Sequence, residues 1–203
     1  MNFLQFQKQF SAFPAISIRE IEKMVSGFNM RNLANWQAKG DIQKIRNGWY
    51  FLTEKKMSEG LLLAIANQIY TPSYISLESA LSWHGLIPEG VFTITSVCTR
   101  KTQLFETPIG KFTYQNIQPD QLTGFRLIES NGWRFKIADV EKTLVDFLHL
   151  HVQYDTIESV DGLRLNPLIM QDIDWSKIAF YANLFQNKAL VHRLQNLKNA
   201  FTH

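Results

Sequence analysis

The chain has 203 residues, of which 21 are Lys or Arg and 18 are Asp or Glu, so its formal net charge is +3. Hydrophobic residues make up 45% and charged residues 19%, which excludes a disordered tail and allows one large domain or two small ones. One cysteine, Cys98, excludes a disulfide-stapled scaffold and a cysteine-rich zinc module. The start of the sequence lacks a signal-peptide pattern and the longest apolar run, residues 61–66, is too short to span a bilayer, so we expect a soluble cytoplasmic protein with no membrane partner.

The positive charge is concentrated near the start of the chain. Residues 1–57 carry a net charge of +5, whereas residues 58–203 carry −2. A basic segment on a near-neutral body is typical of a module that binds a polyanion, although ordinary fluctuation of surface charge explains it equally well. A polar stretch at residues 55–60 predicts the boundary between a domain of residues 1–57 and a domain of residues 58–203.

The N-terminal segment predicts two helices joined by a tight turn, behind a Phe-rich start that supplies a third. Ser17 and Glu20 have the spacing of a capping box, which starts the first of the two helices. Asn29 can cap the second helix, expected over residues 30–39, and Gly40 can end it.

One face of this second helix suits contact with DNA. At about 100° per residue, the polar residues Arg31, Asn35 and Lys39 fall on one side, while Leu33 and Trp36 fall on the other. Arg can pair with guanine and Asn with adenine in the major groove, and Lys suits phosphate. An ordinary solvated helix face is the alternative interpretation.

A hairpin is predicted directly after this helix. Two short strands flank Asn47 and Gly48, a pair that favours a type I′ turn. A helix-turn-helix followed by a two-stranded hairpin is typical of a winged helix, whose wing reaches phosphates or the minor groove. Some winged helices bind only proteins, which is the alternative. The candidate DNA-binding residues on the helix and the wing are Arg31, Asn32, Asn35, Lys39, Lys44 and Arg46.

The remainder of the chain predicts a mixed α/β domain, with a central, largely antiparallel sheet and C-terminal helices, so the fold class is α+β. Asn131 and Gly132 favour a hairpin turn, and Asp139 can cap the helix that follows. Helices are expected at residues 61–69, 76–85, 140–150, 175–185 and 188–201, and strands at residues 91–99, 111–114, 124–129 and 133–137.

The sequence displays little catalytic chemistry. It has no Gly-rich phosphate loop and no zinc-protease motif, so we expect a protein that is not an enzyme, with no catalytic residue, cofactor or metal site. Asp139, Glu141, Lys142 and Asp146 loosely resemble a metal-dependent nuclease site. The simpler interpretation is a helix cap, a first-turn acid and a surface pair of Lys142 with Asp146.

Two further reactive residue types have structural explanations. Cys98 lies in a predicted strand among apolar neighbours, which indicates an inert buried thiol. His149 and His151 come at the end of a predicted helix, where the helix dipole favours histidine. A metal site would require both rings to face the same way and further ligands to join them.

Several motifs resemble those of the AbiEi-type antitoxins. They are YISLESALSWHGLIPE at residues 74–89, TPIGKFTY at residues 107–114 and IADVEKTLVDFL at residues 137–148. The N-terminal pattern is also similar to the winged helix of that family, and the residues that carry this similarity are Leu33, Trp36, Lys39, Gly40, Ile42, Arg46, Gly48 and Tyr50. The resemblance covers about residues 10–150, and the residues after about 155 contribute no motif to it.

The resemblance implies the antitoxin of a bacterial type IV toxin–antitoxin, or abortive-infection, operon. In such proteins the winged helix binds inverted repeats of double-stranded DNA in its own promoter and represses the operon, for which two copies on paired half-sites are expected. The C-terminal domain neutralises a nucleotidyltransferase-like toxin, in many members without a stable complex. The alternatives are an orphan winged-helix transcription regulator, a protein-binding module, and a nuclease or nucleotide-acting enzyme that uses the Asp139–Asp146 group.

Overall fold

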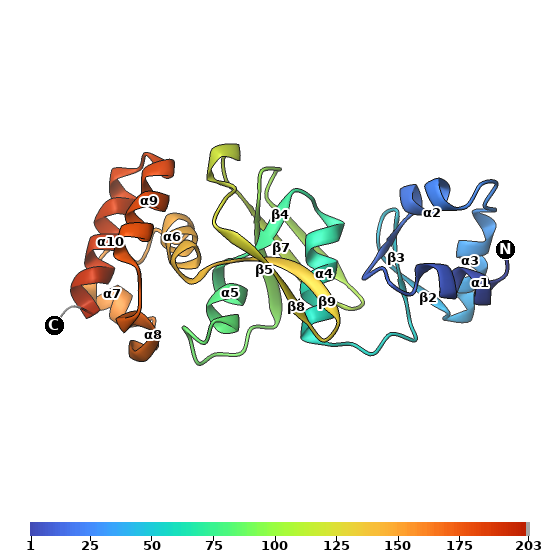
Figure 1. Ribbon diagram of the computed structural model, residues 1–203, viewed down its shortest axis with the longest axis horizontal. Helices are drawn as coiled ribbons and strands as arrows, with labels where there is room; N and C mark the ends of the chain where they lie inside the picture. Colours follow the sequence, from blue (N-terminus) through green and yellow to red (C-terminus); the bar gives the residue numbers. More distant parts are fainter. Residues whose placement is uncertain (202–203) are drawn as a thin grey trace.

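The structure is a computed structural model that describes residues 1–201. Its parts follow the chain along the long axis of the molecule, from a small N-terminal module through a twisted sheet to a group of C-terminal helices (Figure 1). In the described part of the chain, no helix is both long and apolar enough to cross a bilayer.

Residues 1–57, called here the N-terminal module, contain short helices around a small antiparallel sheet. The elements are α1 (Phe3–Phe10), β1 (Ile16–Ser17), α2 (Ile18–Met24), α3 (Arg31–Lys39), β2 (Ile42–Arg46) and β3 (Trp49–Leu52), with strand order β1-β3-β2. The core of the module is built mainly from aromatic and branched side chains. Its buried residues are Phe6, Phe10, Ile16, Ile21, Leu33, Trp36, Ile42 and Leu52.

The helix boundaries follow the predicted capping signals closely. The capping box at the start of α2 is confirmed, because Ser17 Oγ accepts a hydrogen bond from the Glu20 amide at 3.1 Å and Glu20 Oε2 accepts one from the Ser17 amide at 2.7 Å. Asn29 Oδ1 accepts a hydrogen bond from the Arg31 amide at 3.0 Å, although α3 begins one residue later than predicted. Gly40 ends α3 in the left-handed conformation, with φ +79°.

The first hairpin is confirmed, but its predicted turn type is wrong. A type I′ turn needs positive φ at both central residues, whereas only Gly48 of the Asn47-Gly48 pair has it, at +77°. The strand register shifts between Lys44 and Arg46, so a bulge accommodates the twist that a type I′ turn would supply. The second Asn-Gly pair, at residues 131–132, has φ of +52° and +78° and fits the predicted type I′ turn.

Residues 58–201, called here the sheet body, hold a six-stranded mixed sheet of order β6-β7-β5-β4-β9-β8. The pairs β5–β7 and β4–β9 are parallel, and the other three pairs are antiparallel. The α+β class and the C-terminal helices are therefore confirmed, whereas the sheet, predicted to be largely antiparallel, is mixed. The strands are β4 (Ser73–Ile75), β5 (Thr93–Cys98), β6 (Gln103–Thr107), β7 (Gly110–Asn116), β8 (Phe125–Ser130) and β9 (Trp133–Ala138).

Helices cover both faces of this sheet. The helices are α4 (Glu59–Ile69), α5 (Leu77–Trp83), α6 (Val140–Leu150), α7 (Ile157–Asp161), α8 (Pro167–Gln171), α9 (Trp175–Phe185) and α10 (Lys188–Phe201), with a short 3-10 turn at Pro119–Gln121. One face of the sheet, which includes Ile75 and Cys98, packs on α4. The other face, which includes Tyr74 and Val97, packs on α6 and the helices behind it. Cys98 is buried as predicted, and this burial raises the pKa of its thiol.

Candidate functional site

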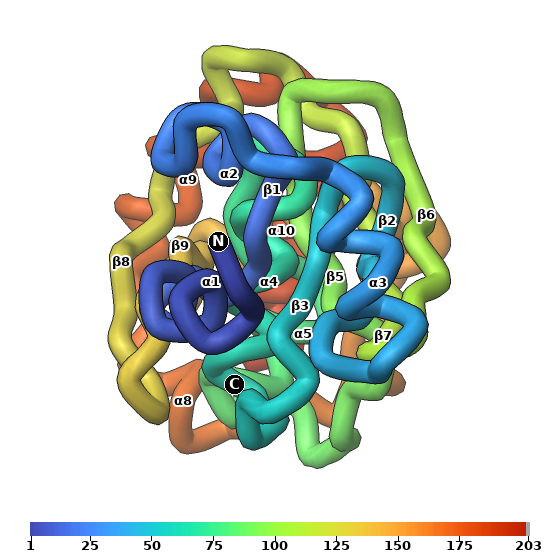
Figure 2. Tube along the Cα trace, turned by 90° about the vertical axis from the view of Figure 1, so that its right-hand side faces the viewer, coloured from blue at the N-terminus to red at the C-terminus, as the bar shows by residue number. Residues whose placement is uncertain are grey.

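The predicted polar face of α3 is exposed. Leu33 and Trp36 are buried in the core of the N-terminal module, whereas Arg31, Asn35 and Lys39 are exposed on the remaining surface of the helix. In Figure 2, α3 lies in front of the sheet body, on the side turned away from it. The projection is therefore confirmed for these five residues, whereas Gln37, projected onto the apolar side, is exposed.

Small and polar residues complete the surface of α3. Ala34 and Ala38 are exposed between the longer side chains, so another backbone could approach the helix closely there. Asn32 is half-buried, and its Nδ2 donates a long hydrogen bond of 3.5 Å to the Met1 carbonyl. Lys44 is exposed on the neighbouring strand β2. This surface therefore combines hydrogen-bonding groups with positive charge, which is the combination that suits a nucleic acid.

Arg46, by contrast, joins the hairpin to the sheet body. Its Nη1 donates a hydrogen bond to the Ile69 carbonyl at 2.7 Å, and its guanidinium lies 4.3 Å from the centre of the Phe105 ring. The side chain is half-buried. The Arg46 side chain is therefore engaged with the sheet body, whereas the sequence predicts that it reaches phosphate from the wing.

Other contacts strengthen the same junction. Gln68 Oε1 accepts a hydrogen bond from the Ala15 amide at 3.0 Å, and Lys55 Nζ lies 4.6 Å from the centre of the Trp133 ring. Ile45 and Phe51 of the hairpin belong to the same buried cluster as the apolar face of α4. The N-terminal module is therefore packed against the sheet body in the structure.

The Lys142–Asp146 pair, part of the charged group around Asp139, lies inside the protein and not on the surface as the sequence predicts. The side chains of Lys142 and Asp146 are paired as predicted, but both are 0% exposed. Asp146 Oδ2 also accepts hydrogen bonds at 2.9 Å from Tyr74 Oη and from Ser76 Oγ. The predicted surface location is wrong because this face of α6 turns toward the sheet, where the pair meets the hydroxyl groups of β4 and of the residue after it.

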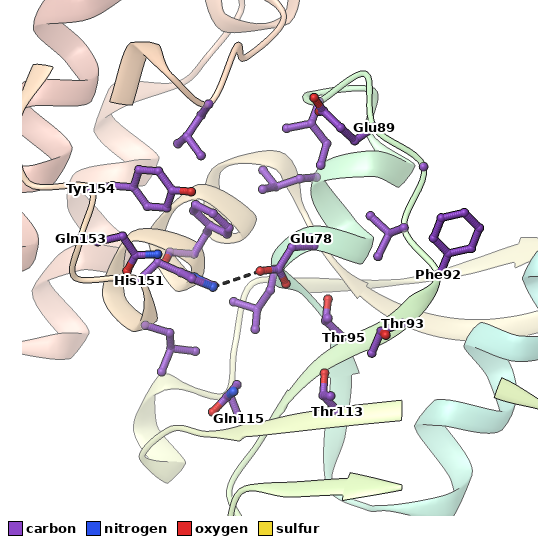
Figure 3. A pocket seen from close by; sticks show the side chains of 18 of the residues that line it. Glu78, Glu89, Phe92, Thr93, Thr95, Thr113, Gln115, His151, Gln153 and Tyr154 are labelled. Carbon is purple, nitrogen blue, oxygen red and sulfur yellow. Dashed lines mark hydrogen bonds and ion pairs between the residues drawn. The ribbon is translucent and has the colours of Figure 1, made fainter. Parts of the chain in front are cut away.

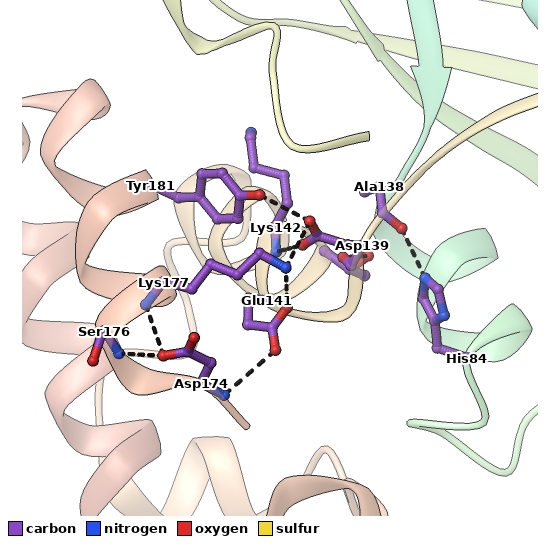
Figure 4. Close-up of polar contacts among 10 residues, drawn as sticks. His84, Ala138, Asp139, Glu141, Lys142, Asp174, Ser176, Lys177 and Tyr181 are labelled. Atoms are coloured by element: carbon purple, nitrogen blue, oxygen red, sulfur yellow. Dashed lines mark hydrogen bonds and ion pairs between the residues drawn. The ribbon is translucent and has the colours of Figure 1, made fainter. Parts of the chain in front are cut away.

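Asp139 connects α6 to α9 (Figure 4). Its Oδ1 accepts a hydrogen bond from the Lys142 amide at 2.9 Å, which confirms the helix cap. Its Oδ2 accepts one from Tyr181 Oη at 2.8 Å and pairs with Lys177 Nζ at 2.9 Å, and Lys177 also pairs with Glu141 at 2.8 Å. Burial, followed by the hydrogen bond to Asp139, raises the pKa of Tyr181 to about 12. Within residues 1–201, no group of three or more His, Cys, Asp or Glu side chains is arranged to hold a metal ion.

A cleft of about 850 Å³, which no motif in the sequence predicts, opens between the sheet and the C-terminal helices. Glu78 of α5 and His151, just after α6, meet across it, with His151 Nε2 3.0 Å from Glu78 Oε1 (Figure 3). Threonines from β5 and β7 form part of its lining. These two residues are 73 positions apart and carry no recognisable spacing, so only the fold brings them together.

His149 and His151, whose spacing in the sequence raises the possibility of a metal site, lie in different environments. His149 packs against the Phe185 ring, and its Nδ1 is buried without a hydrogen-bond partner. His151 instead stacks on Phe147, with ring centres 4.2 Å apart, and its Nδ1 donates to the Phe147 carbonyl at 3.0 Å. Both ring nitrogens of His151 therefore face acceptors, which favours the protonated imidazolium.

The contact between Glu78 and His151 shifts the pKa of each of the two side chains. The hydrogen bond to Glu78 raises the pKa of His151 more than burial lowers it. Burial alone would raise the pKa of Glu78, but hydrogen bonds, above all the one from His151, outweigh it and lower that pKa. The ion pair is therefore formed over a wider range of pH than two isolated groups would allow.

Comparison with known proteins adds a partial match. No protein-family model matches the chain. A sulfate adenylyltransferase from Deinococcus radiodurans is 35% identical over 68 residues, which are 34% of this chain and 17% of that protein. The chain thus spans less than a fifth of the length of that curated relative, and the match leaves the family of this chain open.

We predict different effects for the two basic residues of β2. Under the sequence-based hypothesis that the N-terminal module binds DNA, Lys44→Ala should lower the salt dependence of that binding by about one counterion, because an exposed lysine acts by neutralising phosphate. Arg46→Ala should leave this salt dependence unchanged and lower the free energy of unfolding by about 1–3 kcal/mol, since a charge-assisted hydrogen bond and a ring contact are lost. Binding titrations at several salt concentrations and urea unfolding measure the two effects, and a reduced salt slope for Arg46→Ala would contradict the assignment.

The buried pair gives a second prediction. Lys142→Met should cost about 3–5 kcal/mol of unfolding free energy, because it leaves the Asp146 carboxylate buried without its cation. The double variant Lys142→Met with Asp146→Asn should recover part of this loss, because the uncompensated charge is gone. Lys177→Met, at a more exposed lysine, is the control and should lower the unfolding free energy by less. Equal losses of unfolding free energy for the two lysine variants, measured by urea unfolding, would argue against a buried pair of Lys142 and Asp146.

The pKa shifts of Glu78 and His151 predict a pH window. The raised pKa of His151 adds stability that is fully present below its ordinary value of 6.5 and is lost as pH rises through the folded-state value. The lowered pKa of Glu78 adds stability that is present above its ordinary value of 4.5 and is lost as pH falls through the folded-state value. The unfolding free energy of the wild type should therefore exceed that of Glu78→Gln most between these pH values, and a difference that does not change from pH 5 to pH 9 would refute this.

Proposed function

We propose that the N-terminal module is a winged helix that binds double-stranded DNA, with α3 as the helix that enters the major groove. The order of its helices and strands supports this proposal, because two helices, connected by residues 25–30, precede a two-stranded hairpin. The observation that carries it is the exposure of Arg31, Asn35 and Lys39 on α3, opposite the buried Leu33 and Trp36.

Each exposed side chain of α3 has a role in this proposal. Arg31 and Asn35 donate hydrogen bonds to base edges, where Arg selects guanine and Asn selects adenine. Ala34 and Ala38 let the helix backbone approach the groove. Lys39 contacts phosphate and releases bound counterions. Asn32 lies at the edge of this face, beside the start of the chain, and supplements these contacts.

The hairpin contributes in a more restricted way than a free wing. Lys44 supplies a further phosphate contact from its exposed position, while Arg46 holds the hairpin against the sheet body. One module makes few base contacts, so we propose that two copies bind paired half-sites of an inverted repeat. The docking of the hairpin would then fix the direction in which each sheet body points away from the DNA.

We further propose that the protein is an antitoxin that represses its own operon, as the resemblance to the AbiEi-type antitoxins suggests. The motifs behind that resemblance fall on β4 with α5, on β7, and on β9 with α6. They contain Tyr74, Ser76 and Asp146, which form the buried network, and Glu78 of the cleft. The sheet body would neutralise a nucleotidyltransferase-like toxin, while the N-terminal module represses transcription.

The DNA face is tested by substitution on α3. Arg31→Ala and Asn35→Ala should each weaken binding to the operator by about 1–3 kcal/mol, because each removes a paired hydrogen bond to a base. A gel-shift titration with the inverted repeats upstream of the gene measures this loss. Arg134→Ala, at an exposed arginine of the sheet body, is the matched control and should bind like the wild type. Wild-type affinity of both α3 variants would show that another surface binds the DNA.

The same variants separate the two proposed activities. In cells that express the neighbouring toxin, Arg31→Ala with Asn35→Ala should relieve repression of a promoter reporter and still restore growth. Repression without any rescue by the wild type would leave an orphan transcription regulator as the function. Loss of rescue in the α3 double variant, at equal protein level, would contradict the proposed division between the module and the sheet body.

A further inference from the structure

The cleft between the sheet and the C-terminal helices already holds a cation of the chain itself. The His151 imidazolium lies between the Glu78 carboxylate, at 3.0 Å, and the Phe147 ring, at 4.2 Å between ring centres. The Tyr154 ring lies 6.4 Å from it on a further side. A carboxylate combined with aromatic faces is the environment that binds guanidinium and ammonium groups.

The charges of the cleft favour a positively charged ligand. Of the described side chains that line it, Glu78, Glu89 and His151 are charged, and the lining contains no lysine or arginine. Glu89 is paired with Arg164 and Glu78 with His151, so a ligand cation reaches a carboxylate of the cleft by displacing a partner, and of the two partners only His151 lines the cleft. The C-terminal end of α6 lies in the same wall and adds the negative end of a helix dipole.

The size and polarity of the cleft fit a small organic molecule or side chain. A volume of about 850 Å³ lies within the range of ligand pockets. Ile87, Leu150 and Leu163, beside the buried Leu77, supply partly exposed apolar wall for an aliphatic stem. Thr113 and Gln115 supply polar atoms on the sheet side (Figure 3). Leu77 is itself in the left-handed region, with φ +58°, and such strain in a buried leucine is typical of residues held at functional sites.

We propose that this cleft binds an organic cation, a guanidinium or ammonium group on a short aliphatic stem, which takes the place of His151 beside Glu78. The ligand's N–H groups donate to the Glu78 carboxylate, its charged head lies against the Phe147 and Tyr154 rings, and its stem follows the leucines. The half-exposed side chains of Glu78 and His151, at 36% and 25%, leave this exchange open to a molecule that enters from solvent. This proposal does not depend on DNA binding or on toxin neutralisation.

The test uses the full chain and two probes of equal shape, 1-butylguanidinium and the neutral 1-butylurea. Calorimetry should show binding of the guanidinium at least tenfold tighter than that of the urea. Glu78→Gln should weaken guanidinium binding at least tenfold, because the carboxylate partner is lost. Glu106→Gln, at an exposed glutamate that pairs with Lys111 on the edge of the sheet, is the matched control and should change nothing. Equal binding of the two probes would overturn the proposal.

A second variant separates ligand binding from folding. His151→Gln removes the internal cation that competes for Glu78, so guanidinium should bind severalfold tighter than in the wild type. Because a damaged fold would weaken binding, tighter binding of guanidinium by His151→Gln could not result from misfolding. In the wild type, the NMR signal of the His151 ring should also shift as the probe displaces it. Weaker binding in His151→Gln than in the wild type, with its fold intact by thermal unfolding, would contradict the proposed exchange.

A third probe identifies the source of the cation. The peptide acetyl-Gly-Arg-Gly-amide carries the same guanidinium on a polypeptide. Tighter binding of this peptide than of 1-butylguanidinium would assign the cleft to a basic side chain of a protein partner, and weaker binding would assign it to a free small cation. Failure of both guanidinium probes to bind the wild type would overturn the proposal in either form.

Discussion

The buried Lys142–Asp146 pair is the constraint on which the arrangement of the sheet body depends. A charged pair with no exposed surface is stable only when further polar groups surround it, and the hydroxyl groups of Tyr74 and Ser76 meet this condition. These two hydroxyls come from β4 and the residue after it, in the middle of the sheet. The position of α6 on the sheet is therefore fixed by direction-dependent polar contacts as well as by apolar packing, and α6 in turn positions α9 through Asp139.

The junction between the N-terminal module and the sheet body is built differently. Its polar contacts involve backbone groups, as when Arg46 donates to the Ile69 carbonyl and the Ala15 amide donates to Gln68. The cluster that contains Ile45 and Phe51 adds apolar contacts to them. This junction engages Arg46, a basic residue near the hairpin turn whose position in the sequence suggests contact with phosphate.

Short sequence patterns, such as helix caps, predict much of the fold because the residues that form them interact within a few positions of one another. The capping box at Ser17, the C-terminal Gly40 and the cap at Asp139 each involve residues within a few positions of one another. Strand β6 was missed because its polar edge sequence lacks the usual apolar pattern, and β4 was missed because it has three residues. The burial of Lys142 and the meeting of Glu78 with His151 depend on packing between distant segments, which local spacing does not encode.

Strand β5 connects the cleft with the junction of the N-terminal module. Thr93 and Thr95 near its start line the cleft, and just beyond its end Arg100 lies 4.5 Å from the centre of the Tyr70 ring. The guanidinium of Arg46 lies 5.9 Å from the centre of that same ring.

A ligand changes a distant equilibrium only by binding two arrangements with different affinity. Through β5, occupation of the cleft would therefore alter the orientation of the N-terminal module only if it moved this strand along or across the sheet. Because β5 is paired on both sides, by β4 and β7, such movement would break hydrogen bonds of the sheet. This arrangement favours a body in which the cleft and α3 act independently.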